Sequence, residues 1–211
     1  MNFVINIGRQ LGSGGRAIGE ALAKRLGVGY YDKELIRLAS EQSGFSREFF
    51  EKADERASRR GLGSSLFGIR SAFWSEMPVS HNVLSNDALF KVQSDVIRRL
   101  ADEGSCVFVG RCADYILRDH PRAVSLFITA NHDDRVARLM RINGIDAKQA
   151  EALMEKVDHR RMGYYNYYSN KRWGAAHTYD LCINSSDLGI ERTTDFVEQF
   201  VREKLGLTSD K

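Results

Sequence analysis

Apolar and polar positions follow two patterns that alternate along the chain. Short apolar runs without a helical period predict buried strands at 2–7, 28–31, 106–110, 123–129 and 181–184. The longer segments between them carry apolar residues three and four positions apart, which is the spacing of one helix face. Strands that alternate with helices in this way predict a parallel sheet with helices on both faces.

Local signals indicate where several of these helices begin and end. Gly27 follows the last turn of the first helix, and Asp146 with Gln149 three residues later forms a capping box. Ser85 and Asn131 are predicted N-caps. The predicted helices span 16–26, 33–42, 47–56, 85–102, 132–142, 147–168 and 190–205.

Residues 57–80 form the least regular part of the sequence. They are rich in glycine and serine, yet they include large apolar side chains such as Phe67, Phe73 and Trp74. A wholly disordered linker rarely holds many of these groups. The segment therefore indicates a mobile flap that closes on a ligand, with packing against a second subunit as the alternative.

Size and charge narrow the classes of protein that fit. A chain of 211 residues with 43% hydrophobic residues can bury one substantial core, so a single α/β domain over residues 1–211 is expected. A net charge of +3 does not by itself indicate nucleic-acid binding, and arginine clusters suit a compact polyanion. The histidines show no metal-binding spacing, and no apolar run reaches the roughly 18 residues of a membrane span. Without a signal pattern or a disulfide framework, the chain is expected to be cytoplasmic.

A glycine-rich turn follows the first predicted strand. Gly12, Ser13, Gly14 and Gly15 stand directly before the helix that begins at Arg16. Such a turn directs unpaired backbone N–H groups and the positive end of a helix toward one point. This concentration of glycine is typical of an anion-binding nest rather than of an ordinary strand–helix connection. The sequence therefore predicts a phosphate site at 12–17.

Other polar residues stand where predicted strands end. Asp32 ends the second strand, Arg111 follows the third, and Thr129 ends the fourth. Ligands of open parallel sheets bind beyond the carboxyl ends of the strands. We therefore expect these side chains and the glycine loop to converge on one cleft.

Four motifs, in order from the first strand to the last, together resemble those of the cytidylate-kinase-like family, in the nucleoside monophosphate kinase branch of the P-loop NTPases. They are Gly12-Ser13-Gly14-Gly15-Arg16, Tyr-Tyr-Asp-Lys-Glu-Leu at 30–35, Val-Gly-Arg-Cys-Ala-Asp at 109–114, and Tyr-Asp-Leu-Cys-Ile-Asn-Ser-Ser at 179–186. The resemblance implies a three-layer α/β P-loop fold with about five parallel strands, a helical NMP-binding insertion within 33–85 and an arginine-bearing lid within 132–175. It also implies transfer of the γ-phosphoryl group of ATP, with Mg²⁺, to a nucleoside monophosphate, with CMP or dCMP as the favoured acceptor.

The loop departs from the usual P-loop at two positions. Gly15 stands where that loop has its phosphate-binding lysine, and Ala17 stands where a hydroxyl residue would hold Mg²⁺. Mg²⁺ is therefore expected to bind through the nucleotide and water. Arg16, or alternatively Arg9, would supply the missing positive charge from a different backbone position.

The resemblance implies roles for residues on the acceptor side. Asp32 would orient magnesium-bound water or the acceptor phosphate, with capping of the following helix as the alternative. Arg111 would grip the phosphate of the acceptor, the alternative being a surface ion pair. Asp114 would read the base or ribose, or would instead only interact with a helix dipole.

Several arginines are candidates for the lid, where a guanidinium can stabilise charge on the transferred group. Arg160 and Arg161 follow the Asp146 cap, where the family places its lid, and are favoured as catalytic groups. Arg135 and Arg138, one turn apart, would reach the cleft, where Arg135 would bind substrate, or would pair with Asp133 and Asp134 on a solvated face. Asp158 is a candidate ion-pair partner for the lid arginines or, alternatively, a residue that organises the ligand.

Two other interpretations fit the same sequence. The absent lysine and the irregular 57–80 segment also suit a nucleotide-binding sensor or assembly protein on a kinase fold. Gly8, Gly12 and Gly14, with Tyr167 and Lys171, resemble a short-chain dehydrogenase, although the strands are few for a seven-stranded dinucleotide domain. The expected partners are a nucleoside triphosphate and a small phosphorylated acceptor, with no nucleic acid and no membrane. Homo-oligomer formation stays open.

Overall fold

The central element is a five-stranded parallel sheet with the strand order β2-β3-β1-β4-β5. It comes from a computed structural model that describes residues 2–32 and 83–207. All five predicted strands are present, and β1 extends two residues further toward the glycine loop than its pattern indicated. The strands are β1 Val4–Arg9, β2 Gly29–Tyr31, β3 Cys106–Val109, β4 Ala123–Thr129 and β5 Leu181–Asn184.

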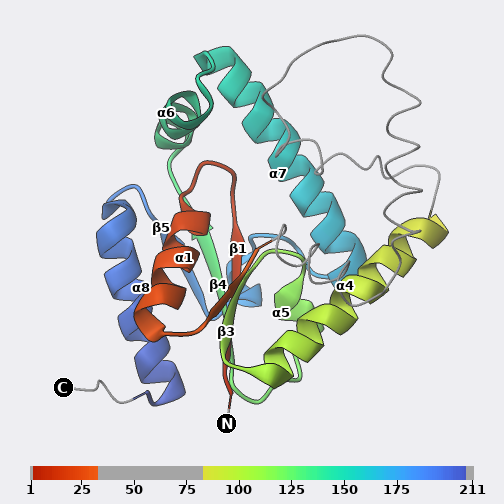
Figure 1. The fold of residues 1–211 in the computed structure, drawn as a ribbon. Helices are drawn as coiled ribbons and strands as arrows, with labels where there is room; N and C mark the ends of the chain where they lie inside the picture. The colour runs from red at the N-terminus through yellow and green to blue at the C-terminus, as the bar shows by residue number, and fades with distance from the viewer. Residues whose placement is uncertain (1, 33–82, 208–211) are drawn as a thin grey trace. The chain divides into compact units, whose positions relative to one another are not determined.

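The helices alternate with these strands, as predicted (Figure 1). The predicted helices at 33–42 and 47–56 and the flap at 57–80 lie outside the described residues. A short helix, α5, follows β3 at a place where the pattern indicated no separate element. The described helices are α1 Gly15–Leu26, α4 Val83–Glu103, α5 Ala113–Ile116, α6 His132–Asn143, α7 Ala147–Ser169 and α8 Gly189–Leu205, with a 3₁₀ turn at Ala176–Thr178.

The cap predictions had mixed outcomes. The capping box is confirmed, because the Asp146 carboxylate accepts the Gln149 N–H while the Gln149 side chain accepts the Asp146 N–H. Asn131 does precede α6, but its side chain makes no cap bond and instead accepts from Asn184. Ser85 was wrong as a cap, because α4 already includes Val83.

The main core lies between one face of the sheet and the pair α1 and α8. Ile5 and Ile7 of β1 point into it, together with Leu22 of α1 and Val197 of α8. Because strand side chains alternate between faces, Asn6 and Gly8 point to the opposite face, where α5 and α7 lie. Phe108 and Phe127 are buried on that face as well, so the polar residues described below lie beside hydrophobic packing.

The chain divides into two units, one made of Met1–Lys33 with Ile97–Lys211 and the other of Glu34–Val96. The sheet and the candidate site belong to the first unit. Within the two described ranges, every helix is too short or too polar to cross a lipid bilayer.

Candidate functional site

The glycine loop between β1 and α1 has the backbone that its sequence predicts. Gly12 and Gly14 adopt positive φ angles of 78° and 81°. A Cβ atom on Gly12 would lie 2.8 Å from the Arg135 carbonyl oxygen, and one on Gly14 would overlap Ile190 of α8. Glycine is therefore required at both positions by backbone conformation and by space.

The start of α1 offers free donors. Gly14 is its N-cap and provides no side-chain cap, and the first turn contains no acidic residue. Among the described residues, the N–H groups of Gly12 and Gly14 have no hydrogen-bond acceptor. The positive end of the helix dipole is thus left uncompensated, which is the arrangement that binds anions.

Ser13 stabilises the loop from inside. It is fully buried, and its hydroxyl donates to the Gln10 carbonyl at 2.9 Å. Its own carbonyl accepts from the Ser185 hydroxyl at 2.6 Å, and the Gln10 side chain accepts from Thr129. Contributions from the ends of β4 and β5 therefore keep the loop in one conformation.

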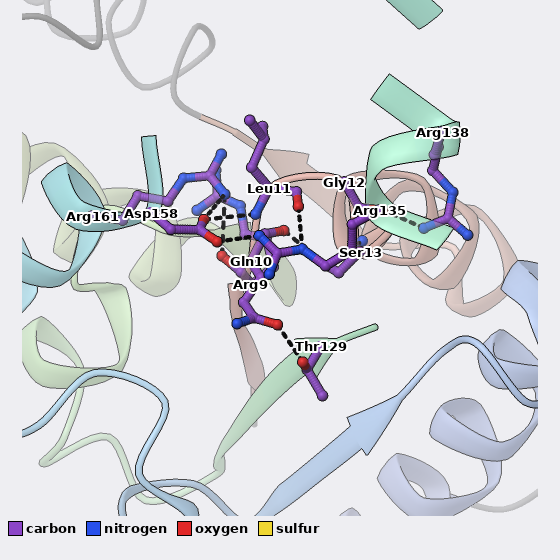
Figure 2. Close-up of polar contacts among 11 residues, drawn as sticks. Arg9, Gln10, Leu11, Gly12, Ser13, Thr129, Arg135, Arg138, Asp158 and Arg161 are labelled. Atoms are coloured by element: carbon purple, nitrogen blue, oxygen red, sulfur yellow. Dashed lines mark hydrogen bonds and ion pairs between the residues drawn. The ribbon is translucent and has the colours of Figure 1, made fainter. Parts of the chain in front are cut away.

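Three arginines from α6 and α7 bind backbone carbonyls in the loop and at the end of β1 (Figure 2). Because the arginines bind carbonyl oxygens, they do not occupy the loop N–H groups, which stay available to a ligand. The contacts join Arg135 Nε to the Leu11 carbonyl at 2.7 Å, Arg138 to the Gly12 carbonyl, and Arg161 to the Arg9 carbonyl at 3.1 Å.

Asp158 organises this arginine group. Its carboxylate accepts the Leu11 N–H at 2.7 Å, pairs with Arg135 and lies 3.7 Å from Arg161. The predicted ion-pair role of Asp158 is confirmed. Burial raises its pKa, although the Leu11 N–H and the two guanidinium groups oppose that shift.

The lysine position of the loop is closed to any side chain. A Cβ atom on Gly15 would lie only 2.6 Å from Cβ of Arg9, and one on Gly110 would overlap the Arg9 guanidinium. The Arg9 side chain therefore extends from Gly15 toward Gly110 at the end of β3. Arg9, which the sequence offered only as an alternative source of charge, occupies this space.

Arg16, the other candidate for the missing charge, pairs with Asp32 at 2.9 Å. The Arg16 side chain is 70% exposed, whereas that of Asp32 is 10% exposed. The structure thus joins the start of α1 to the end of β2 and brings two predicted site residues together. Arg16 lies at the open edge of the loop.

A cavity of about 60 Å³ lies beside the loop, on the sheet face that carries Asn6 and Gly8. Three of its lining residues are arginines: Arg9, Arg111 and Arg161. Arg111 reaches it through a left-handed turn in which Gly110, Arg111 and Cys112 all have positive φ angles. Such a turn is unusual for residues other than glycine and points to a functional constraint.

The charges around this cavity are unbalanced. Burial, followed by the positive charges of Arg161 and Arg111, lowers the pKa of Arg9. Asp114 also lines the cavity, and burial raises its pKa, although the 2.6 Å hydrogen bond from the Tyr165 hydroxyl opposes the shift. Three guanidinium groups and one carboxylate line the cavity, and although Asp158 lies 3.7 Å from Arg161, an anion would stabilise the remaining positive charge.

The predicted site residues fall into groups. Arg111, Asp114 and Arg161 meet at the cavity, whereas Arg160 does not line it. Arg135 is buried behind the loop, so its predicted contact with substrate stays a prediction. The sequence analysis did not single out Asn6, which is buried in β1. A polar residue in an otherwise apolar strand was the signal that could have identified it.

Binding of Mg²⁺ through the nucleotide and water stays a prediction. Within the described ranges, no group of three His, Cys, Asp or Glu side chains could hold a metal. Asp32 is the carboxylate that contacts the loop residue Arg16. Mg²⁺ commonly uses one or two carboxylates together with nucleotide phosphates, so Asp32 is the residue that would help to hold it.

Comparison with known proteins agrees with this architecture. A structure of an uncharacterized protein from Eubacterium ventriosum ATCC 27560 matches with a TM-score of 0.69 and 29% identity, covering 95% of this chain and 98% of that one. Shikimate kinase from Acinetobacter baumannii, in complex with shikimate, matches with a TM-score of 0.52 and 12% identity over 96% and 94% of the two chains. A gluconokinase from Sinorhizobium meliloti 1021 matches with a TM-score of 0.54 and 11% identity over 98% of each chain. No curated protein matches.

The family comparison is more specific than these fold similarities. The cytidylate kinase-like family matches residues 4–187, which include every described strand. The strand order and the glycine loop before α1 are those of a P-loop kinase fold. The chain therefore belongs to the cytidylate kinase-like family and has the P-loop kinase fold.

Proposed function

We propose that this protein is a nucleotide-binding phosphotransferase, which uses ATP and Mg²⁺ to phosphorylate a nucleoside monophosphate, with CMP or dCMP as the favoured acceptor. The observation that carries the proposal is the cavity lined by Arg9, Arg111 and Arg161 beside the uncapped start of α1. One anion site at the helix and a second at the arginines match a donor and an acceptor that each carry phosphate.

The residues divide between the two substrates. Loop amides at 12–17, with Arg16 at the open edge, would bind the triphosphate. Arg111 and Arg9 would hold the acceptor phosphate, and Arg161 lines the same cavity, so it would stabilise charge on the moving group. Arg160 from α7 and Arg135 are further candidates from the same region. Bound Mg²⁺ supplies neutralisation of phosphate charge.

The wider organisation belongs to the same proposal. Residues 33–85 would be the NMP-binding insertion, and 132–175 would be the lid, since Arg161 of α7 lines the cavity. The proposal also includes a cytoplasmic location. Assembly into a homo-oligomer is compatible with it. Unlike the kinase reading, the dehydrogenase interpretation gains no support from the family or from the strand order.

The direct experiment is a magnesium-dependent, ADP-coupled screen of all nucleoside monophosphates and several small phosphorylated metabolites. We expect one pyrimidine acceptor to stand out. Arg111→Ala should raise KM for that acceptor by about 10-fold or more while the affinity for ATP stays unchanged, because a charge-assisted contact to phosphate contributes about 1.5–3 kcal/mol. Arg192→Ala on the exposed surface of α8 is the matched control. Equal acceptor kinetics in the parent and Arg111→Ala would remove Arg111 from the site.

A second candidate is a nucleotide sensor without catalysis. It is favoured by Arg9 closing the lysine position and by Arg16 being paired with Asp32. Both arrangements leave the bridge between the β- and γ-phosphates without its usual ammonium group. Binding of ATP and CMP without ADP formation from any acceptor would support the sensor over the kinase.

A further inference from the structure

Asn6 is the most anomalous side chain on the cavity. It occupies the middle of β1, the central strand, and only 2% of it is exposed. Neither its amide nitrogen nor its amide oxygen has a hydrogen-bond partner among the described residues. A buried amide with no partner destabilises a fold, so its presence in a central strand calls for a ligand or for water.

The neighbouring polar groups do not satisfy Asn6 because they bind one another. The Tyr165 hydroxyl donates to Asp114 at 2.6 Å, and Tyr179 accepts the Gly174 N–H at 3.4 Å. Tyr164 forms a hydrogen bond with Arg111. Asn6 lines the cavity, and among the described residues the NH2 group and the oxygen of its amide, a donor group beside an acceptor, are both unused.

Charge limits what Asn6 can receive. A second anion placed at the amide would share the cavity with the Asp114 carboxylate, and a cation would share it with Arg9, Arg111 and Arg161. A neutral polar group avoids both conflicts. Trp173 and Tyr179 line the cavity and are held by Phe127, with ring centroids 5.2 and 5.0 Å from its ring, so the cavity has an aromatic wall that suits a flat ring.

We propose that Asn6 is the residue that selects the acceptor, by binding the edge of a neutral heterocycle that presents one donor and one acceptor side by side, as a pyrimidine base does. This inference rests on the proposed function, in which the arginines hold the phosphate of the same molecule. At about 60 Å³ the cavity is too small for a whole nucleotide, so only the edge of the ring enters it and the rest of the acceptor lies outside. Because a carboxamide can turn over, Asn6 accepts the edges of cytosine and uracil alike.

The test compares the parent with Asn6→Leu, in which an apolar side chain of similar shape replaces the amide. Calorimetry would measure the affinities for ATP, CMP, UMP and ribose 5-phosphate, which has the phosphate but no base. We expect CMP and UMP to bind at least 10-fold more weakly, while ATP and ribose 5-phosphate bind as in the parent. The thermal midpoint should not fall, because an unpaired buried amide has been removed.

Two further variants complete the design. Asn6→Val suits a central strand if leucine is too long, and the same changes in affinity are expected. Thr193→Val is the matched control, because Thr193 of α8 is also buried, its hydroxyl has no partner in the described part of the chain, and it does not line the cavity. It should change none of the four affinities.

The outcomes separate this inference from the proposed function. If the parent binds CMP and both Asn6 variants bind it equally well, the inference is overturned and the proposed function stands. If both variants unfold, the amide serves the fold, and the inference is also overturned. If the parent binds ATP but neither pyrimidine nucleotide, both proposals fail. If the variants lose CMP binding selectively, the role of Asn6 is supported. If the parent also transfers no phosphoryl group to any acceptor, the proposed kinase activity is rejected.

Discussion

Replacing Asp158 with asparagine tests how the glycine loop is held. The carboxylate accepts the Leu11 N–H, pairs with Arg135 and lies near Arg161. Asparagine keeps an oxygen for the Leu11 N–H but removes the negative charge. Arg135, whose side chain is only 8% exposed, would then be a buried guanidinium without its partner.

The size of the effect follows from this burial. Removing one partner of a buried ion pair costs about 3–5 kcal/mol, far more than breaking an exposed pair. We expect the lower end, about 3 kcal/mol, because burial already raises the pKa of Asp158 and thus disfavours its charged form. For a protein of this size, that corresponds to a fall of roughly 6–12 °C in thermal midpoint.

The assay is a double-mutant cycle measured by urea unfolding, with Asp158→Asn, Arg135→Met and the double variant. Once Arg135 has been replaced by an apolar side chain, losing the carboxylate should cost much less, so a coupling energy of at least about 1 kcal/mol is expected. Asp195→Asn is the control, since Asp195 forms a more exposed pair with Arg25, with side chains 58% and 34% exposed. It should change stability by a few tenths of a kcal/mol.

Additive effects in this cycle would refute the reasoning, because they would show that Asp158 and Arg135 do not depend on one another. A loss no larger than that of the surface control would refute it as well. Affinity for ATP is an independent readout, since the Leu11 carbonyl and amide are held by the same two side chains. Its weakening in Asp158→Asn would connect loop position to nucleotide binding.

Two further predictions concern the edges of the site. Arg16→Ala should weaken ATP binding by about 10-fold through loss of a guanidinium at the loop; unchanged affinity would show that Arg16 serves only its pair with Asp32. Burial raises the pKa of Asp114, so its contribution to stability is fully present below the ordinary value of about 3.9 and is lost as pH rises through the higher folded pKa. Unfolding free energies of the parent relative to Asp114→Asn should therefore fall across that interval, and a difference independent of pH would contradict this.

The sheet was predictable because its signals are local. Runs such as those of β3 and β4 are apolar at consecutive positions, as strands buried on both faces must be. The capping box at Asp146 likewise depends on residues three positions apart. α5 was missed because it is only four residues long and begins from a left-handed turn at Gly110–Cys112, which the apolar pattern does not encode.

The arginine assignments were less predictable because their contacts span long separations. Arg135 and Arg138 lie 124 and 126 residues from the loop carbonyls that they bind, and Arg161 lies 152 residues from Arg9. The sequence indicated that guanidinium groups gather near the loop, but it did not distinguish one that meets substrate from one that holds backbone. Packing shows only which of them borders the cavity: Arg161 lines it and also binds the Arg9 carbonyl, whereas Arg135 lies behind the loop.

The missing lysine is the clearest case in which packing changes the meaning of a sequence feature. In the sequence, Gly15 at the lysine position indicates a P-loop that lacks the positive charge of that lysine. In the structure, Gly15 is one of two glycines that make room for the Arg9 side chain, and Gly110 at the end of β3 is the other. A lysine at position 15 and an arginine at position 9 would compete for the same space, so the charge belongs to the strand instead of the helix. There it contributes to the group of Arg9, Arg111 and Arg161, which in our proposal binds the acceptor phosphate rather than bridging the β- and γ-phosphates.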